Sequence, residues 1–168
     1  GALSQQPVAT FTKLNFKGAN SFTKTAFTEI GYDYTVSFLI NPAANPGENI
    51  NLFKSPNAEV KLKQGKTGKL GFSRDGYDYD FDYSLPEKTW TKVTITGTSK
   101  GTSLYINGKL QKKLQDNWIQ YTDKDKTKMR RSETLVFPLE QVGGFKGKIN
   151  QLKVWNRVLT DQEIEAIK

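Results

Sequence analysis

The chain has 168 residues, 12% of them aromatic, and its 25 Lys and Arg against 17 Asp and Glu give a formal net charge of +8. It contains no Cys and no His, which excludes a disulfide, a Ser-His-Asp triad, a Cys-His pair and a His-based zinc site. The length predicts one domain over residues 1–168, with residues 1–8 as a linker. The aromatic content indicates a folded chain with an aromatic core.

Short segments that alternate apolar and polar residues dominate the chain, and turn signals separate them. Such alternation is typical of a β-strand with one buried face. In chain order, strands are expected at residues 10–16, 34–40, 50–53, 60–62, 69–72, 77–83, 90–96, 103–106, 109–113, 134–137 and 148–155. Asn107-Gly108 predicts a tight hairpin between two of them. A break in the apolar phase of the last strand predicts a β-bulge near Asn150 or Gln151.

The end of the chain predicts one short helix, from about Asp161 to Ile167. Thr160 and Glu163 have the spacing of a reciprocal capping box. Leu159 and Ile164 have the spacing of a hydrophobic staple across the same cap. Many short strands followed by one capped helix predict an all-β fold, an antiparallel β-sandwich with a short C-terminal helix.

The sharpest alternation runs from Tyr77 to Tyr83. It places four aromatic residues on one strand face and three aspartates on the other. The aromatic face is expected to line the core, since it is costly to leave in water, and the aspartates to form a solvated surface. Tyr77 and Arg74, at the loop end of this strand, and Tyr32 at another strand edge are the exceptions that could reach a ligand.

The segment from Gln115 to Glu133 does not share this rhythm, and we expect a long connection without regular structure that is functional or mobile. Its first half holds Asp116, Asn117, Trp118 and Tyr121. Its second half is basic, and a solvated mobile loop is favoured there over a site for an anionic polymer. No nucleic-acid motif accompanies the basic residues. No apolar run has the ~20 residues of a membrane helix, so no membrane insertion is expected.

Three segments resemble laminin-G-like and concanavalin-A-like domains: Trp90–Thr96, Leu104–Leu110 and Phe145–Ile164. They match, in order, a strand that begins with Trp, a Leu-Tyr-Val-Asn-Gly hairpin, and the closing strand with its Asn-Arg-x-Leu turn and helix start. The resemblance implies a jelly-roll sandwich in which Trp90 and Trp155 hold structural positions. Asn150 stands where many relatives have Asp, so no motif supports a structural calcium ion, and no cofactor is expected.

The resemblance also implies a function. Such modules are often appended to bacterial surface glycosidases, where they bind glycans without cutting them. We therefore expect a non-catalytic, monomeric module of a longer Gram-positive surface glycoside hydrolase, located outside the cell. Its expected partner is a galactose-containing glycan such as lactose or N-acetyllactosamine. The Glu-x-Asp-x-x-Glu motif of glycosidases with this fold is absent.

A sugar site needs an aromatic ring that stacks on the apolar face of the sugar, with amide or carboxylate groups for its hydroxyls. The residues that offer these groups are Trp118, Tyr121, Asn117, Asp116, Arg74, Tyr77 and Tyr32. Trp118 could equally be an anchor that pins its loop. The alternative function is a structural or protein-adhesion spacer without a sugar site, and binding of sialic acid or another anionic glycan is a further alternative.

Overall fold

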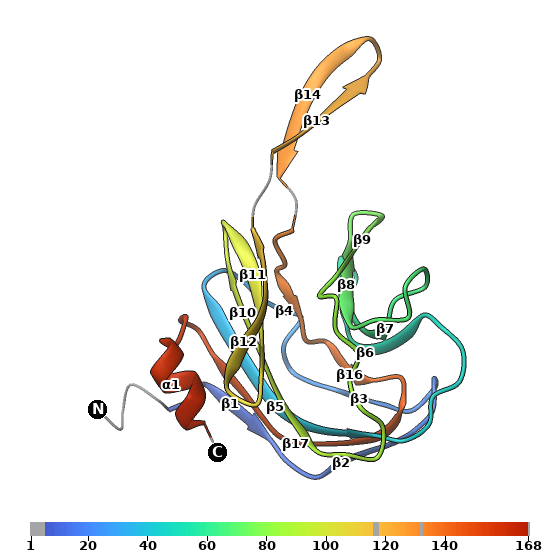
Figure 1. Cartoon of the computed structure of the whole chain (residues 1–168), viewed down its shortest axis with the longest axis vertical. Coiled ribbons are helices and arrows are strands. Elements are labelled where there is room, and N and C mark those ends of the chain that lie inside the picture. Colours follow the sequence, from blue (N-terminus) through green and yellow to red (C-terminus); the bar gives the residue numbers. More distant parts are fainter. Residues whose placement is uncertain (1–5, 116–117, 132, 168) are drawn as a thin grey trace.

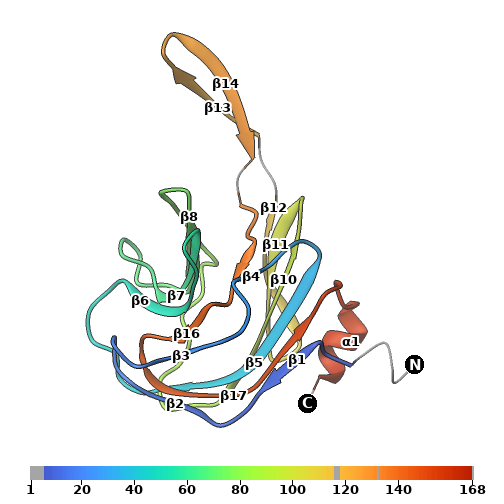
Figure 2. The same ribbon diagram turned by 180° about the vertical axis from the view of Figure 1, so that it is seen from behind.

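The protein is a sandwich of two antiparallel sheets, shown in Figures 1 and 2 by a computed structural model that describes residues 6–115, 118–131 and 133–167. The first sheet has the order β1-β17-β5-β10-β11-β12, and β2 pairs with β17 beyond the end of β1. Its strands are β1 (Ala9–Phe11), β2 (Leu14–Lys17), β5 (Tyr34–Pro42), β10 (Thr91–Thr98), β11 (Gly101–Ile106), β12 (Lys109–Gln115) and β17 (Lys146–Trp155).

The second sheet has the order β3-β16-β6-β7-β8-β9. Its strands are β3 (Phe22–Lys24), β16 (Gln141–Gly143), β6 (Ile50–Lys54), β7 (Ala58–Lys63), β8 (Gly71–Arg74) and β9 (Tyr77–Asp80). A short pair, β4 (Glu29–Ile30) with β15 (Phe137–Pro138), completes the body. The expected antiparallel sandwich is confirmed.

Aromatic rings connect the two sheets through the core. Phe38 of the first sheet lies edge-on to Phe53 of the second at a centroid distance of 5.2 Å, Phe53 lies 5.0 Å from Phe137, and Phe137 lies 5.6 Å from Tyr34. Edge-to-face pairs of this kind contribute about 0.5–1.5 kcal/mol each beyond burial of their area. The expectation of an aromatic core is therefore confirmed.

Positive backbone φ angles mark the places where the strands are interrupted. The expected strand at residues 10–16 is in fact two strands, because Lys13 between β1 and β2 has φ +54°. The expected bulge in β17 is present: the register with β5 shifts between Asn150 and Lys153, and Gln151 has φ +51°. Asn107 and Gly108 both have positive φ, as a type I′ hairpin turn requires.

The segment expected to be structureless is a β-hairpin, so that prediction was wrong. β13 (Trp118–Asp123) and β14 (Lys126–Arg131) pair antiparallel, and the turn residues Lys124 and Asp125 have φ +52° and +63°. Neither strand pairs with any other in the described part of the chain. The hairpin projects beyond one end of the sandwich (Figures 1 and 2). The basic run expected in a mobile loop therefore lies mostly in β14.

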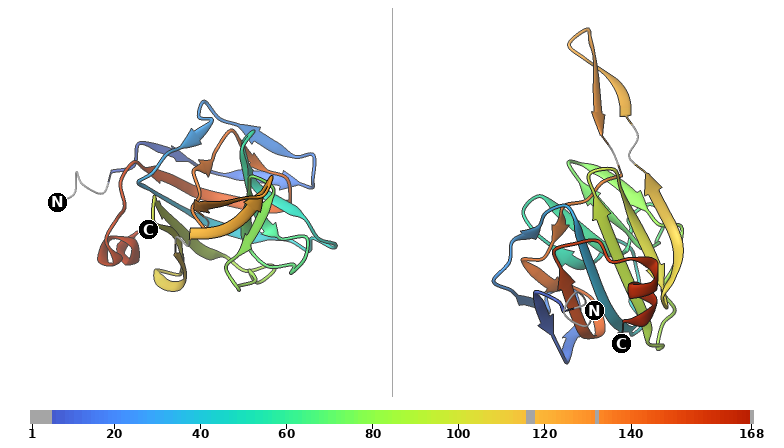
Figure 3. Two further views of the ribbon diagram at one scale, coloured as in Figure 1. Left: turned by 90° about the horizontal axis from the view of Figure 1, so that it is seen from above. Right: turned by 90° about the vertical axis from the view of Figure 1, so that its left-hand side faces the viewer.

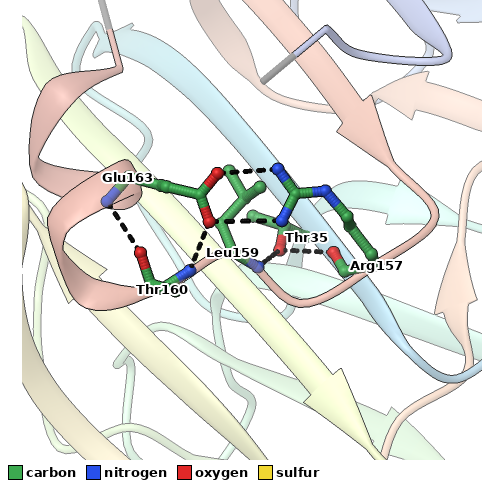
Figure 4. A network of polar contacts seen from close by, with 5 residues as sticks. All are labelled: Thr35, Arg157, Leu159, Thr160 and Glu163. Carbon is green, nitrogen blue, oxygen red and sulfur yellow. Dashed lines mark hydrogen bonds and ion pairs between the residues drawn. The ribbon is translucent and has the colours of Figure 1, made fainter. Parts of the chain in front are cut away.

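The helix α1 (Asp161–Ala166) lies against the outer face of the first sheet (Figure 3, right). The predicted capping box is present, with Glu163 N donating to Thr160 Oγ1 at 3.1 Å and Thr160 N donating to Glu163 Oε1 at 3.0 Å (Figure 4). Leu159 and Ile164, the predicted staple, are both buried in a small cluster with Tyr105 and Trp155. With six residues, α1 is too short to cross a membrane, and the described residues contain no other helix.

The two tryptophans expected in structural positions have different surroundings. Trp155 is buried under α1, with 3% of its surface exposed. Trp90 directly precedes β10 and is 47% exposed. Trp90 is exposed because it comes before the buried part of its strand, which begins at Thr91.

Candidate functional site

The β8–β9 hairpin places Arg74 and Tyr77 side by side at the end of the sandwich from which β13 and β14 project (Figure 1). The two residues are cross-strand partners, and they flank the turn residues Asp75 and Gly76. Both turn residues have positive φ, +51° and +80°, which is the geometry that Asp-Gly favours in a tight hairpin. Local turn chemistry thus fixes the position of Arg74 beside Tyr77.

The guanidinium of Arg74 is held by two neighbours. Its Nη1 donates to the carbonyl oxygen of Thr134 at 2.8 Å and to Thr134 Oγ1 at 2.5 Å, and its Nε and Nη2 donate to Asp75 Oδ2 at 3.1 and 2.9 Å. Partial burial would lower the pKa of Arg74, but the contacts with Asp75 outweigh it and raise the pKa. Four of the five N–H donors are therefore used within the protein, so Arg74 acts mainly as an anchor.

Tyr32, Glu29 and Asn57 complete this cluster from other elements. Tyr32 precedes β5 and is close enough to raise the pKa of Arg74 further. Glu29 belongs to β4, and its Oε1 accepts a hydrogen bond of 2.9 Å from Nδ2 of Asn57. The side chains of Tyr32 and Tyr77 are 40% and 48% exposed. We call these five residues, Glu29, Tyr32, Asn57, Arg74 and Tyr77, the rim cluster.

Two shallow hollows lie at the rim cluster, and Arg74, Asp75 and Asn57 line both. One has a volume of about 220 Å³ and is also lined by Glu29 and Val136. The other has a volume of about 270 Å³ and extends over the β6–β7 turn. Carboxylate, amide and guanidinium groups therefore line the hollows, and two exposed phenol rings belong to the same cluster. This combination can hold a sugar by stacking and hydrogen bonding.

Four hydrogen bonds tie the base of the β13–β14 hairpin to the sandwich. Thr102 Oγ1 of β11 donates to the carbonyl oxygen of Glu133 at 2.9 Å, and the Tyr34 hydroxyl of β5 donates to that of Leu135 at 2.7 Å. Between Glu133 and Leu135, Thr134 accepts two hydrogen bonds from Arg74 Nη1 of β8, one at its carbonyl oxygen and one at Oγ1. The hairpin base is thus bound to strands of both sheets, next to the rim cluster.

The sequence-predicted site residues fall into three groups. Arg74, Tyr77 and Tyr32 come together in the rim cluster. The backbone of Trp118 and Tyr121 lies in β13, opposite Arg131 and Lys128 of β14. Asp116 and Asn117 lie outside the described residues.

Sequence reasoning missed Glu29 and Asn57. Glu29 lies in a two-residue strand and Asn57 in the turn between β6 and β7. Neither residue stands in a motif, and only the pairing of distant strands brings them to Arg74. The Ser-Pro-Asn turn signal at residues 55–57 could have marked Asn57 as exposed, but it does not indicate a partner.

The aspartates of the Tyr77–Tyr83 segment have local partners. Asp78 Oδ1 accepts from Ser73 Oγ at 2.6 Å, Asp80 Oδ1 accepts from the amide of Asp82 at 2.9 Å, and Asp82 pairs with Lys69. The strand ends earlier than expected, at Asp80, but Tyr79 in β9 and Tyr83 beyond its end pack against the core and Phe81 is buried, as predicted. These aspartates therefore have the surface roles that the alternation indicated.

Asn150 uses its side-chain oxygen within the fold. Oδ1 accepts hydrogen bonds from the amides of Lys13 at 3.0 Å and Gln151 at 2.9 Å, which links the bulge of β17 to the break between β1 and β2. Among the described residues, no group of three or more carboxylates is placed to hold a metal ion.

Structural comparison finds similar sandwiches in three carbohydrate-related or receptor-binding proteins. Domain 4 of AbnA, a GH43 extracellular arabinanase from Geobacillus stearothermophilus solved with arabinotriose, aligns over 92% of this chain and 85% of its own, with 18% identity and a TM-score of 0.55. The receptor-binding domain of botulinum neurotoxin C/D mosaic serotype aligns over 95% and 43%, with 15% identity and a TM-score of 0.55. Trypanosoma rangeli sialidase aligns over 92% and 27%, with 13% identity and a TM-score of 0.53.

These likenesses establish the fold alone, because one sandwich fold carries many functions. A search of curated proteins finds no matching sequence. Residues 15–165 match the Laminin_G_3 family, described as the concanavalin A-like lectin/glucanases superfamily. The match covers nearly the whole sandwich, from β2 to the end of α1. The chain therefore belongs to the concanavalin A-like lectin/glucanases superfamily.

Proposed function

We propose that the protein is a non-catalytic glycan-binding module that holds its ligand at the rim cluster. The observation that carries this proposal is the presence of two exposed phenol rings, Tyr32 and Tyr77, near a fixed Arg74 guanidinium that lines two hollows with a carboxylate and an amide. The β13–β14 hairpin rises beside this cluster, so Trp118 and Tyr121 belong to the same end of the molecule.

The side chains of the rim cluster suit a short, neutral oligosaccharide. The exposed phenol rings offer stacking surfaces for the C–H face of a sugar ring. Glu29 accepts hydrogen bonds from hydroxyls, and Asn57 both donates and accepts them. Shallow hollows bury few ligand atoms, so we expect a weak dissociation constant, on the order of 10 μM to 1 mM. A module of this kind raises the local concentration of an attached enzyme at its substrate.

Galactose-containing glycans, with lactose and N-acetyllactosamine first, are the ligands that we propose, on the basis of the family resemblance. Arabinotriose, with which the arabinanase domain was solved, and the sialic acid derivative of the sialidase complex widen the set to be tested. The proposal also places the module outside the cell, in a longer glycoside hydrolase or surface protein of Gram-positive origin.

A glycan array followed by titration calorimetry tests the proposal. We expect the wild type to bind at least one neutral oligosaccharide, and Tyr77→Ala and Tyr32→Ala each to weaken binding tenfold or more. Phe22→Ala is the matched control, because Phe22 is 44% exposed in β3 of the second sheet and lies outside the rim cluster. Its affinity should stay within twofold of the wild type.

The outcome separates the proposal from its alternatives. A wild type that binds no glycan would favour the spacer or protein-adhesion domain. Glycan binding that both tyrosine variants retain would place the sugar site elsewhere. Turnover of an aryl glycoside that disappears when one carboxylate is replaced would show an enzyme.

A further inference from the structure

A second polar surface lies at the opposite end of the sandwich from the rim cluster. It is centred on Lys148 of β17, which is in register with Asn15 of β2 on one side and with Asn41 of β5 on the other. Two residues earlier in β17, Lys146 is in register with Lys17 of β2. Residues two apart in a strand share a face. The five residues therefore form one outward-facing block on three neighbouring strands.

This block borders a hollow of about 390 Å³. Lys88 reaches it from the segment before β10, since the amide of Lys88 is hydrogen-bonded at 2.7 Å to the carbonyl oxygen of Pro42 at the end of β5. We call the surface formed by these six side chains the lysine groove: Asn15, Lys17, Asn41, Lys88, Lys146 and Lys148. The rim cluster and the groove lie near opposite ends of β5, about seven residues or roughly 23 Å apart along the strand.

The positive charge of the lysine groove is not compensated within the described residues. The ion pairs and side-chain hydrogen bonds found in that part of the chain include none from Lys17, Lys88, Lys146 or Lys148. Within three positions of any residue that lines the hollow, the sequence has a single carboxylate, Glu87. Four cations around one hollow attract anions, and the hollow concentrates their field.

The groove also offers groups that suit a hydroxylated chain. Asn15 and Asn41 each present an amide that can donate and accept hydrogen bonds. Trp90 lies at the border of the groove, because Thr91 is in register with Ile40 and the next residue of β5 is Asn41. With 47% of its surface exposed, the indole of Trp90 can stack on a sugar ring. Lysines two apart on a strand are roughly 7 Å apart, and cross-strand neighbours about 5 Å. The groove can therefore contact successive charges of one polymer.

We infer that the lysine groove binds an acidic polysaccharide, with its carboxylate or sulfate groups on the four lysines and a sugar ring against Trp90. This site is separate from the one proposed at the rim cluster and does not depend on it. Lysine is a compact point charge without the planar fork by which arginine recognises phosphates and bases, and the groove contains no arginine. The amides of the groove, next to its lysines, suit a polymer whose hydroxyl groups lie next to anionic groups.

The test measures binding of the whole chain to fluorescently labelled dextran sulfate, hyaluronate and neutral dextran at two salt concentrations. We expect binding to one or both acidic polymers that weakens with salt, as screening requires, and no binding to neutral dextran. Dextran sulfate and hyaluronate distinguish sulfate from carboxylate as the recognised group. The double variant Lys146→Gln/Lys148→Gln should weaken binding at least tenfold.

The matched control is Lys66→Gln/Lys100→Gln, which removes the same charge from two exposed turn lysines outside the groove. It should change affinity less than threefold, whereas an equal loss in both double variants would reduce the effect to net charge and overturn the proposal. Trp90→Ala should weaken polysaccharide binding but leave binding of inorganic polyphosphate unchanged, since polyphosphate has no ring to stack. An unchanged affinity of Trp90→Ala for the polysaccharide would overturn the stacking role.

Two further outcomes decide the ligand class. Tighter binding of a single-stranded DNA oligomer than of either polysaccharide, lost in Lys146→Gln/Lys148→Gln, would assign the groove to nucleic acid and refute the inference. Tyr32→Ala and Tyr77→Ala should leave acidic-polymer binding intact, so failure of the rim proposal and failure of this one are distinguishable. Far-ultraviolet circular dichroism of each variant verifies the fold.

Discussion

The guanidinium of Arg157 meets the carboxylate of Glu163 in a two-pronged contact, with Nη2 2.7 Å from Oε2 and Nη1 3.2 Å from Oε1 (Figure 4). Glu163 Oε1 also accepts the amide hydrogen of Thr160. Together the hydrogen bonds from Arg157 and Thr160 lower the pKa of Glu163 to about 2. One carboxylate thus caps α1 and ties the preceding turn to it.

Glu163 should make the C-terminal cassette sensitive to acid. Because the folded-state pKa lies below the ordinary value of 4.5, the contribution of Glu163 to stability is complete above about pH 4.5 and is lost as the pH falls toward 2. Urea unfolding between pH 6 and pH 2.5 should show a smaller acid-dependent loss in Glu163→Gln than in the wild type. Glu48→Gln, in an exposed loop, is the control. Parallel pH curves for Glu163→Gln and the wild type would contradict this role.

Thr35 should be essential for docking the turn before α1. Its buried hydroxyl donates to the carbonyl oxygen of Arg157 at 2.9 Å and accepts the amide hydrogen of Leu159 at 3.0 Å. Thr35→Val keeps the shape but leaves both backbone groups without their partner, and each such loss costs about 1–3 kcal/mol. We expect urea denaturation to show a loss of about 2–4 kcal/mol in Thr35→Val. Thr35→Ser retains the hydroxyl and should lose less than half as much.

Gly97 should not tolerate a side chain. It is in register with Tyr34, and a Cβ at Gly97 would overlap the ring and the hydroxyl of Tyr34. Overpacking of a core costs about 1–3 kcal/mol, and displacement of Tyr34 would also break its hydrogen bond to Leu135. We expect Gly97→Ala to lower the free energy of unfolding by at least about 2 kcal/mol. Gly31→Ala, where a Cβ meets no atom within 4 Å, is the control, and an equal effect at both glycines would refute the steric explanation.

The β13–β14 hairpin should be dispensable for folding. Replacing residues 116–132 by a four-residue Gly/Asn/Ser linker retains the four hydrogen bonds at Glu133, Thr134 and Leu135. Since the two strands pair only with each other among the described residues, the thermal midpoint should change by less than about 3 °C, less than 1 kcal/mol for a domain of this size. Loss of glycan binding in this well-folded variant would assign the ligand contact to the hairpin. A cooperative unfolding transition that disappears would show that the hairpin is part of the core.

The raised pKa of the buried Tyr34 predicts a loss of stability at high pH. Burial, followed by the proximity of Tyr32, raises the pKa of Tyr34 well above 10. A raised folded-state pKa gives stability that is complete below about pH 10 and is lost as the pH rises further. Tyr34→Phe should flatten the decline of unfolding free energy above pH 10, although it costs stability at neutral pH by leaving the Leu135 carbonyl unpaired. An equally steep decline in this variant would contradict the assignment.

Features with a local physical cause could be predicted from the sequence. The capping box at Thr160 and Glu163, the tight turn at Asn107-Gly108 and the bulge at Asn150-Gln151 each depend on residues within a few positions of one another. They were found because spacing and turn chemistry determine them. The break at Lys13 was missed, because a lysine rarely adopts positive φ and its amide is satisfied by the distant side chain of Asn150.

Features that depend on exposure or on distant pairing could not be predicted. Among the described residues the strands β13 and β14 pair only with each other, and their sequence lacks the apolar alternation by which strands are found. The motif indicated a structural position for Trp90, but the exposure of its side chain depends on where the strand begins. The lysine groove joins residues from β2, β5 and β17 that no motif connects. Arg74 and Tyr77, in contrast, were correctly placed at a strand end, since the Asp-Gly turn is local.

The fastening of residues 133–135 has a mechanical consequence. A ligand that pulls on the β13–β14 hairpin loads Tyr34 in the middle of the first sheet, Thr102 in the neighbouring part of that sheet and Arg74 in the second sheet at once. The force is then divided among four hydrogen bonds to strands of both sheets. In a protein held to a surface through this hairpin, tension would therefore be transmitted to both sheets of the sandwich rather than to one strand.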